Sequence, residues 1–213
     1  MLPIIYLHGF ASGPGGYKAR YFKDHLNALG FDVHVPDLNG PDFFHMTMTS
    51  QIEILRKTRD ALPEGPVILM GSSMGCVVAG HYALGHPPVD RMVLMAPAFG
   101  FVDRWLAEMG DKGWRRWQEE GKKAVFHFAY QEERFLSPQI VEDYRKYDPS
   151  DLDRLDMPIF IVHGRYDDIV PCSGSRRFAE GKSNVQLTLV EDDHHLIKKL
   201  DQFTAGITAF LTQ

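Results

Sequence analysis

The sequence is poor in the features that mark secreted and membrane-spanning proteins. Its 213 residues include only two cysteines, Cys76 and Cys172. Two cysteines are too few for a disulfide framework, so we expect a reducing compartment. No apolar run approaches the roughly 18 residues that cross a bilayer, and the first apolar run is short and has no basic segment before it. The sequence therefore predicts a cytoplasmic protein without a membrane span.

Positive charge is also scarce. The chain has 23 Lys and Arg against 28 Asp and Glu, which gives a formal net charge of -5. Proteins that bind phosphate backbones need a basic surface instead. Charged residues make up 24% and hydrophobic residues 44% of the chain, close to the averages of a globular domain, about 25% and 45–50%. We therefore expect a globular protein that does not bind nucleic acid, with its oligomeric state left open.

Six short apolar runs, rich in Val, Ile and Leu, recur along the chain. Most are continuous rather than alternating, which is typical of strands buried on both faces of a parallel sheet. The predicted strands are residues 4–7, 33–35, 67–70, 92–95, 159–162 and 186–190. The helical patterns are residues 17–29, 49–62, 73–84 and 195–211. This alternation predicts an α/β fold with a doubly wound, mostly parallel sheet.

One segment, residues 101–147, is longer, more polar and more aromatic than a crossover helix requires. We expect one domain over residues 1–213, in which residues 101–147 form an inserted helical cap. All three tryptophans, Trp105, Trp114 and Trp117, lie in this segment. Two interpretations stay open: the aromatic side chains form a small core that attaches the insertion to the sheet, or they line an apolar substrate pocket.

The clearest chemical signal is the sequence Gly71-Ser72-Ser73-Met74-Gly75, which follows an apolar strand and begins a helical pattern. In a strand–turn–helix of this type the first and last positions must be small, because the tight turn presses them against the neighbouring strand and helix. The turn exposes the middle side chain at the edge of the sheet, and the helix N-terminus favours negative charge there. Ser73 is the predicted nucleophile, and Ser72 a hydrogen-bonding neighbour.

A serine hydroxyl is a weak nucleophile until a base takes its proton, so a histidine and an orienting carboxylate are expected as well. The loop after the fifth apolar run contains Asp167 and Asp168, and the loop after the sixth contains His194 and His195. Serine, aspartate and histidine thus follow in chain order, each beyond the carboxyl end of a strand, where ligands bind in open α/β sheets.

These motifs resemble the α/β-hydrolase superfamily and are similar to its small bacterial serine esterases. The resemblance covers the chain except residues 101–147. His8-Gly9-Phe10 matches the oxyanion loop of the family, and His163-Gly164-x-x-Asp167-x-x-Val170-Pro171 matches its acid loop. The resemblance implies that Asp167 is the acid, that His194 rather than His195 is the base, and that the oxyanion hole consists of the backbone N–H groups of Phe10 and Met74.

The sequence departs from the family in two respects. Only residues 1–7 precede His8, so the two antiparallel strands that usually come before the oxyanion loop are absent, and a minimal sheet of six strands is expected. Cys76 stands where many small esterases have glycine or alanine. Neither departure removes a chemical group. The remaining histidines do not have the spacing of metal ligands, so we expect neither a metal nor a cofactor.

The sequence therefore predicts a serine hydrolase that cleaves a carboxylic ester or a thioester through an acyl-enzyme on Ser73. Its partner is expected to be a small-molecule acyl substrate, with Trp105, Trp114 and Trp117 as candidate contacts. Two alternatives stay open. The same triad serves peptidases and C–C bond hydrolases, because fold does not decide function. The second alternative is a small-molecule binding protein that has the hydrolase fold but no catalytic turnover.

Overall fold

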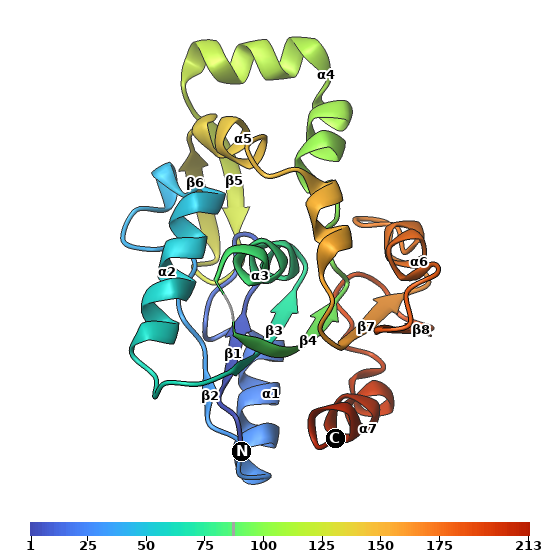
Figure 1. Cartoon of the computed structure of the whole chain (residues 1–213). Coiled ribbons are helices and arrows are strands. Elements are labelled where there is room, and N and C mark those ends of the chain that lie inside the picture. Colours follow the sequence, from blue (N-terminus) through green and yellow to red (C-terminus); the bar gives the residue numbers. More distant parts are fainter. Residues whose placement is uncertain (87) are drawn as a thin grey trace.

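A six-stranded parallel sheet forms the centre of the computed structural model, which describes residues 1–86 and 88–213 (Figure 1). Every pair of neighbouring strands is parallel. Across the sheet the strands follow the order β2 (Val33–His34), β1 (Ile4–Leu7), β3 (Val67–Ser72), β4 (Val89–Met95), β7 (Ile159–Gly164) and β8 (Val185–Val190). Each predicted apolar run is a strand, and the expected fold class is confirmed.

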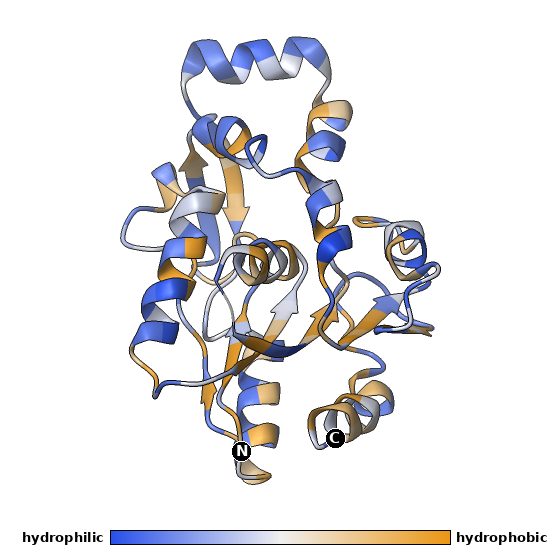
Figure 2. Ribbon diagram, in the orientation of Figure 1, coloured by the Kyte–Doolittle hydropathy of each residue, from blue (hydrophilic) through white to orange (hydrophobic). Residues whose placement is uncertain are grey.

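Both faces of the sheet are covered by helices, which explains the continuous apolar strands. One face packs against α2 (Met48–Asp60) and α3 (Met74–Gly85), and the other packs against α1 (Tyr17–Ala28) and α7 (Leu200–Leu211). In β1, Leu7 points into the first core and Tyr6 into the second. Side chains alternate between the faces of a strand, so both sets must be apolar. Figure 2 shows this hydrophobic centre.

Three of the four predicted helices agree in position with α1, α2 and α3, and the fourth differs at its start. The pattern predicts a helix from residue 195, but α7 begins at Leu200. Leu196 adopts a φ of 53°, which a continuing helix cannot contain, and the Lys199 N–H donates to the Asp192 carboxylate at 2.9 Å. Residues 192–199 are therefore a loop. The shorter helices are η1 (Phe43–His45), η2 (Pro149–Arg154) and α6 (Ser173–Ala179).

Residues 101–147, called the insertion below, lie beyond the carboxyl ends of the central strands (Figure 1). The insertion contains α4 (Phe101–Glu120), β5 (Lys123–His127), β6 (Glu132–Leu136) and α5 (Gln139–Tyr144). The expectation of a helical cap is incomplete, because β5 and β6 pair as an antiparallel hairpin. Exposure alternates along β5, so this half-buried segment has the period of a strand. α4 itself is kinked at Gly110, where φ is 66°.

The hairpin tip touches the loop that follows β1. The Phe128 N–H donates to the Ala11 carbonyl at 2.7 Å. At the other end of the insertion, the buried Asp143 carboxylate accepts hydrogen bonds of 2.8 Å from the N–H and the hydroxyl of Thr49, in the first turn of α2. These contacts fasten the insertion to two parts of the α/β core. None of the helices within the described ranges is both long enough and apolar enough to span a bilayer.

Gly75 permits the close approach of α3 to β1, and we expect Gly75→Ala to destabilise the fold. A Cβ at this position would overlap the carbonyl oxygen of Leu7 and lie 2.7 Å from that of His8. Because these are backbone atoms of the sheet, the substitution should lower the free energy of unfolding by about 1–3 kcal/mol, measured by urea denaturation.

Gly85→Ala is the matched control in the same helix, because nothing lies within 4 Å of a Cβ added there. This variant should be as stable as the wild type or slightly more stable. Equal unfolding midpoints for the two variants would contradict the close approach of α3 to β1.

Candidate active site

The loops after β1 and β3 meet at the point where the strand order changes direction. From β1 the chain crosses to β2 on one side and then to β3 on the other. In open α/β sheets, ligands bind in the crevice at this point, beyond the carboxyl ends of the strands. A Cβ on Gly9 would lie 3.3 Å from the Cβ of Ser73. The structure thus brings His8-Gly9-Phe10 against the turn that contains Ser73.

Ser73 has an unusual backbone conformation, with φ 53° and ψ -119°. Such a conformation is unfavourable for a residue with a side chain and requires support from its surroundings. The Ser73 N–H donates to the Met95 carbonyl at 2.9 Å, and its own carbonyl accepts from the N–H groups of Cys76 and Ala98 at 3.1 and 3.2 Å. A Cβ on Gly71 would lie 2.7 Å from the Cys76 backbone, so this position must be glycine.

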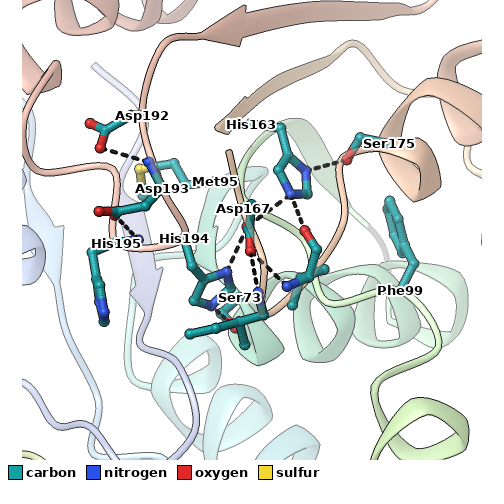
Figure 3. A network of polar contacts seen from close by, with 12 residues as sticks. Ser73, Met95, Phe99, His163, Asp167, Ser175, Asp192, Asp193, His194 and His195 are labelled. Atoms are coloured by element: carbon teal, nitrogen blue, oxygen red, sulfur yellow. Dashed lines mark hydrogen bonds and ion pairs between the residues drawn. The ribbon is translucent and has the colours of Figure 1, made fainter. Parts of the chain in front are cut away.

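Hydrogen bonds join Ser73, His194 and Asp167 (Figure 3). His194 Nε2 lies 3.0 Å from Ser73 Oγ, and His194 Nδ1 lies 2.7 Å from Asp167 Oδ2. The carboxylate can only accept, so Nδ1 donates to it and Nε2 remains free to accept from the hydroxyl. In this arrangement a histidine can remove the proton of a serine.

The structure distinguishes the adjacent candidates in both loops. Asp168 is exposed, whereas Asp167 is buried. The His195 ring is exposed and lies apart from the contacts around Ser73 (Figure 3), and its backbone N–H donates to Asp193 Oδ1 at 2.9 Å. Asp167 and His194 are therefore the members of each pair that the fold brings to Ser73.

The Asp167 carboxylate is enclosed by hydrogen-bond donors. Its Oδ1 accepts from the N–H groups of Ile169 and Val170 at 3.1 and 2.6 Å, and its Oδ2 accepts from His163 Nε2 at 3.1 Å as well as from His194. Burial raises the pKa of Asp167, but the bonds from His163, His194 and Val170 outweigh it. The pKa therefore lies well below its ordinary range, and the group stays ionised where a histidine titrates.

His163 is a site residue to which the sequence analysis gave no role, although it is part of the acid-loop motif, and Ser175 is one that the sequence analysis missed. His163 Nδ1 lies 2.7 Å from the hydroxyl of Ser175 in α6, and both side chains are fully buried. A signal for His163 existed, because it is four residues before Asp167 at the end of a buried strand, where a polar side chain needs a partner. Nothing in the sequence singles out Ser175. Among the residues that the structure describes, no three His, Cys, Asp or Glu side chains form a metal-ligand set.

His8 braces the loop that contains Phe10. Its Nε2 lies 2.9 Å from the Leu38 N–H, and its Nδ1 lies 2.9 Å from the Gly9 carbonyl. An N–H can only donate, so Nε2 is the acceptor and Nδ1 donates to Gly9. On the other side, Met74 is the first residue of α3. The first N–H groups of a helix have no acceptor within the helix.

The three tryptophans occupy different places in the insertion. Trp117 is buried, and its Nε1 donates to the Leu136 carbonyl at 3.0 Å. Trp114 packs edge-on against Trp117, with 5.7 Å between ring centroids. Trp105 lies 5.0 Å from the Trp117 ring and 5.6 Å from the Phe10 ring. Trp117 is thus a core residue of the insertion, whereas Trp105 reaches the loop beside Ser73.

A cavity of about 230 Å³ lies between α3, the start of α4 and residues 144–152, and its lining does not include Ser73, Asp167 or His194. Ala98 lines it and donates its N–H to the Ser73 carbonyl, and Phe101 lines it with its ring 5.7 Å from that of Phe10. The lining around Ala98 and Phe101 is largely apolar, but it also contains Asp103 of α4, and other polar side chains come from α3 and from the segment after α5. The apolar lining includes Val77, Ala98, Phe99, Phe101 and Val102, and the polar lining includes His81, Arg145, Tyr147 and Asp148.

Three known proteins illustrate what this chain is similar to. Bovine "Palmitoyl-protein thioesterase ABHD10, mitochondrial" is 25% identical over 214 residues, covering 93% of this chain and 68% of that protein. Est1E from Butyrivibrio proteoclasticus, solved with ferulic acid bound, has a TM-score of 0.83 at 18% identity over 100% of this chain and 88% of its own. A monoacylglycerol lipase from Paleococcus ferrophilus has a TM-score of 0.76 at 17% identity over 99% and 95%.

These similarities agree with the parallel sheet and with the expected superfamily, which is confirmed. The model of one family, described as an uncharacterised protein family, matches residues 3–212. The match includes both the α/β core and the insertion. The chain therefore belongs to the uncharacterised protein family UPF0227, and its fold is that of the α/β-hydrolases.

Proposed function

We propose that this protein is a serine hydrolase that cleaves a carboxylic ester or a thioester. The observation that carries the proposal is the pair of hydrogen bonds at His194, 3.0 Å to Ser73 Oγ and 2.7 Å to Asp167 Oδ2. The similar proteins support it, because one is named a palmitoyl-protein thioesterase and another a monoacylglycerol lipase. Their names describe thioester and ester cleavage.

In the proposed reaction, Ser73 Oγ attacks the carbonyl carbon of the substrate while His194 Nε2 takes the hydroxyl proton. Asp167 stabilises the imidazolium through Nδ1–H. The tetrahedral intermediate then collapses: the bond to the alcohol or thiol breaks, and His194 gives its proton to that leaving group. Water, deprotonated by His194, attacks the acyl-enzyme in the same way, which releases the carboxylic acid and restores the Ser73 hydroxyl.

The N–H groups of Met74 and Phe10 are proposed to bind the oxyanion of the intermediate. Met74 supplies a helix N-terminal N–H directly after the nucleophile. Two sets of hydrogen bonds hold the Phe10 loop. His8 bonds the Leu38 N–H and the Gly9 carbonyl, and the Phe128 N–H donates to the Ala11 carbonyl. Donors held in place before the reaction need no reorganisation when the charge develops, and one such donor is worth about 10²–10³ in turnover in other enzymes.

The cavity between α3 and the start of α4 is the proposed acyl pocket. It is connected to the Ser73 turn through Ala98, whose N–H donates to the Ser73 carbonyl, and to the oxyanion loop through Phe101, whose ring packs against Phe10. Burial of an apolar acyl group there would be favourable by about 0.8 kcal/mol for each methylene. Of the three tryptophans, Trp105 supports this pocket, because its ring lies 5.4 Å from Phe101 and 5.6 Å from Phe10.

The first test is Ser73→Ala, which removes one oxygen and no packing volume. Hydrolysis of nitrophenyl esters and acyl thioesters should fall by about 10⁴-fold or more, and labelling by a fluorophosphonate probe should disappear. Ser72→Ala is the matched control, since it removes the same atom from the adjacent residue, and this variant should be labelled and active. Full turnover in purified Ser73→Ala would overturn the proposal.

The second test is the pH profile of kcat/KM. Asp167 has a lowered pKa and stays ionised as the pH falls, so loss of activity at acidic pH reports protonation of the imidazole that must accept the Ser73 proton. kcat/KM should rise with pH on the acidic side and then level off, because only an unprotonated imidazole can accept the Ser73 proton. A flat profile from about pH 5 to about pH 8, the range in which histidines commonly act as bases, would contradict the role of His194 as general base.

The third test compares two tryptophans with the same substitution. Trp105→Leu should lower kcat/KM for an octanoyl ester about tenfold relative to an acetyl ester, because it loosens Phe101 and Phe10 at the pocket. Trp114→Leu should change this ratio less, because the Trp114 ring contacts the pocket lining at Arg145, in its polar part. Equal ratios in the two variants would mean that the aromatic side chains serve only as the core of the insertion.

A further inference from the structure

We propose that His163 and Ser175 are positioning residues, which hold the Asp167 carboxylate in the orientation that His194 requires. The inference rests on the proposed function. It concerns two fully buried polar side chains that touch neither Ser73 nor His194 directly and that the triad chemistry does not itself use.

Five side chains form one continuous series of hydrogen bonds, Ser175–His163–Asp167–His194–Ser73 (Figure 3). The two imidazoles end on the same carboxylate oxygen, Oδ2, with His163 Nε2 at 3.1 Å and His194 Nδ1 at 2.7 Å. A serine hydroxyl lies beyond each ring, at 2.7 Å from His163 and 3.0 Å from His194. Asp167 thus stands between two similar serine–histidine pairs, of which one is buried.

The contacts of His163 determine where its proton lies. Nε2 faces two acceptors, Asp167 Oδ2 and the Val170 carbonyl, the latter at 2.8 Å. Neither acceptor has a proton to give, so Nε2 carries one and shares it between them. Nδ1 faces the Ser175 hydroxyl at 2.7 Å, and a hydroxyl can pair with it as donor or as acceptor. Ser175 therefore holds the ring in the orientation in which Nε2 donates to Asp167.

These contacts hold the carboxylate from both sides. The N–H groups of Ile169 and Val170 fix Oδ1, but a carboxylate bound only through one oxygen can still tilt. His163 donates to the second oxygen, Oδ2, and also to the Val170 carbonyl. Because His163 is a residue of β7, these two contacts attach the acid loop to that strand. Rotation of Asp167 away from His194 would then leave buried donors unpaired, which costs about 1–3 kcal/mol for each group.

The end of β7 also sets the loop that contains His194. A Cβ on Gly164, the residue after His163, would overlap the Asp192 carbonyl and lie 2.5 Å from that of Asp193. His163 therefore sits where the acid loop and the histidine loop meet. A small displacement there would change the distance between Asp167 and His194, and in enzymes a misplacement of about 1 Å can lower the rate about 100-fold.

A charged group from another element also lies near Asp167. Lys18 of α1 lies within electrostatic range of Asp167, Asp192 and Asp193, and burial lowers its pKa to about 8. Lys18 therefore changes charge on the alkaline side of the profile. The acidic limb of kcat/KM then reports on His194 as proton acceptor and not on Lys18, which makes it a suitable readout for a contact that acts on His194 through Asp167.

The experiment compares His163→Leu, His163→Gln and Ser175→Ala with the wild type. His163→Leu removes the donor to Oδ2, so kcat should fall about 10- to 100-fold with KM changed less than about twofold. The pKa of Asp167 rises without this donor, and a more basic carboxylate holds the imidazole proton more tightly, so the acidic limb should move to higher pH. His163→Gln, whose amide can donate to Asp167, should recover most of kcat.

Thr204→Val is the matched control for Ser175→Ala, because Thr204 is a buried hydroxyl on α7 that donates to the Leu200 carbonyl at 2.7 Å. Ser175→Ala should lower kcat about two- to tenfold, and Thr204→Val should not change kcat or the pH profile. A purely structural role would lower Tm in all these variants and leave the acidic limb where it is. That result, or a glutamine variant as slow as the leucine variant, would overturn the inference.

Should His163→Leu fail to fold, His163→Gln and Ser175→Ala decide the question by the same readouts. The rate constant for fluorophosphonate labelling separates this inference from the function on which it rests. If the wild-type Ser73 is not labelled, the proposed function fails and the positioning role fails with it. If Ser73 is labelled equally fast in the wild type and in all folded His163 variants, the positioning role alone is wrong.

Discussion

The turn between β3 and α3 holds Ser73 at a φ of 53°, a conformation that costs about 1–3 kcal/mol and persists because the surrounding backbone fixes it. Gly71 and Gly75 let strand and helix approach closely enough to close this turn. The same approach brings the carboxyl end of β1 beside the serine. The close packing of α3 against β1 and β3 therefore brings together the Phe10 loop, the start of α3 and the Ser73 side chain.

The second constraint is the buried carboxylate of Asp167. An ionised group in the interior is costly unless donors surround it, and here two backbone N–H groups and two imidazoles do so. Those donors lower its pKa below the ordinary range despite burial. The need to satisfy this charge ties β7, α6 and the loop after β8 into one network. Stability and the orientation of His194 thus depend on the same contacts.

The sequence predicts features that depend on local pattern. Continuous apolar runs identify the strands, since a strand covered on both faces must be apolar at successive positions, and the glycines around Ser73 identify the turn. The β5–β6 hairpin is missed because its alternation in residues 123–127 is short and lies in a polar segment. Ser175 is missed for a different reason. Its partner, His163, lies on another element, and local sequence does not indicate a contact that forms only through tertiary packing.

The insertion contacts the loop after β1 at two adjacent residues, Phe10 and Ala11. Its hairpin tip binds the loop after β1 through Phe128 and Ala11, while Trp105 and Phe101 in α4 pack against the Phe10 ring. Phe10 therefore lies between a rigid α/β core and a segment whose α4 is kinked at Gly110. Because the N–H of Phe10 is a proposed oxyanion donor, a change in the insertion can alter the shape of the pocket and the position of this donor together. Substrate preference and turnover are then coupled through the two aromatic contacts of Phe10, although the insertion supplies none of the three side chains proposed to react.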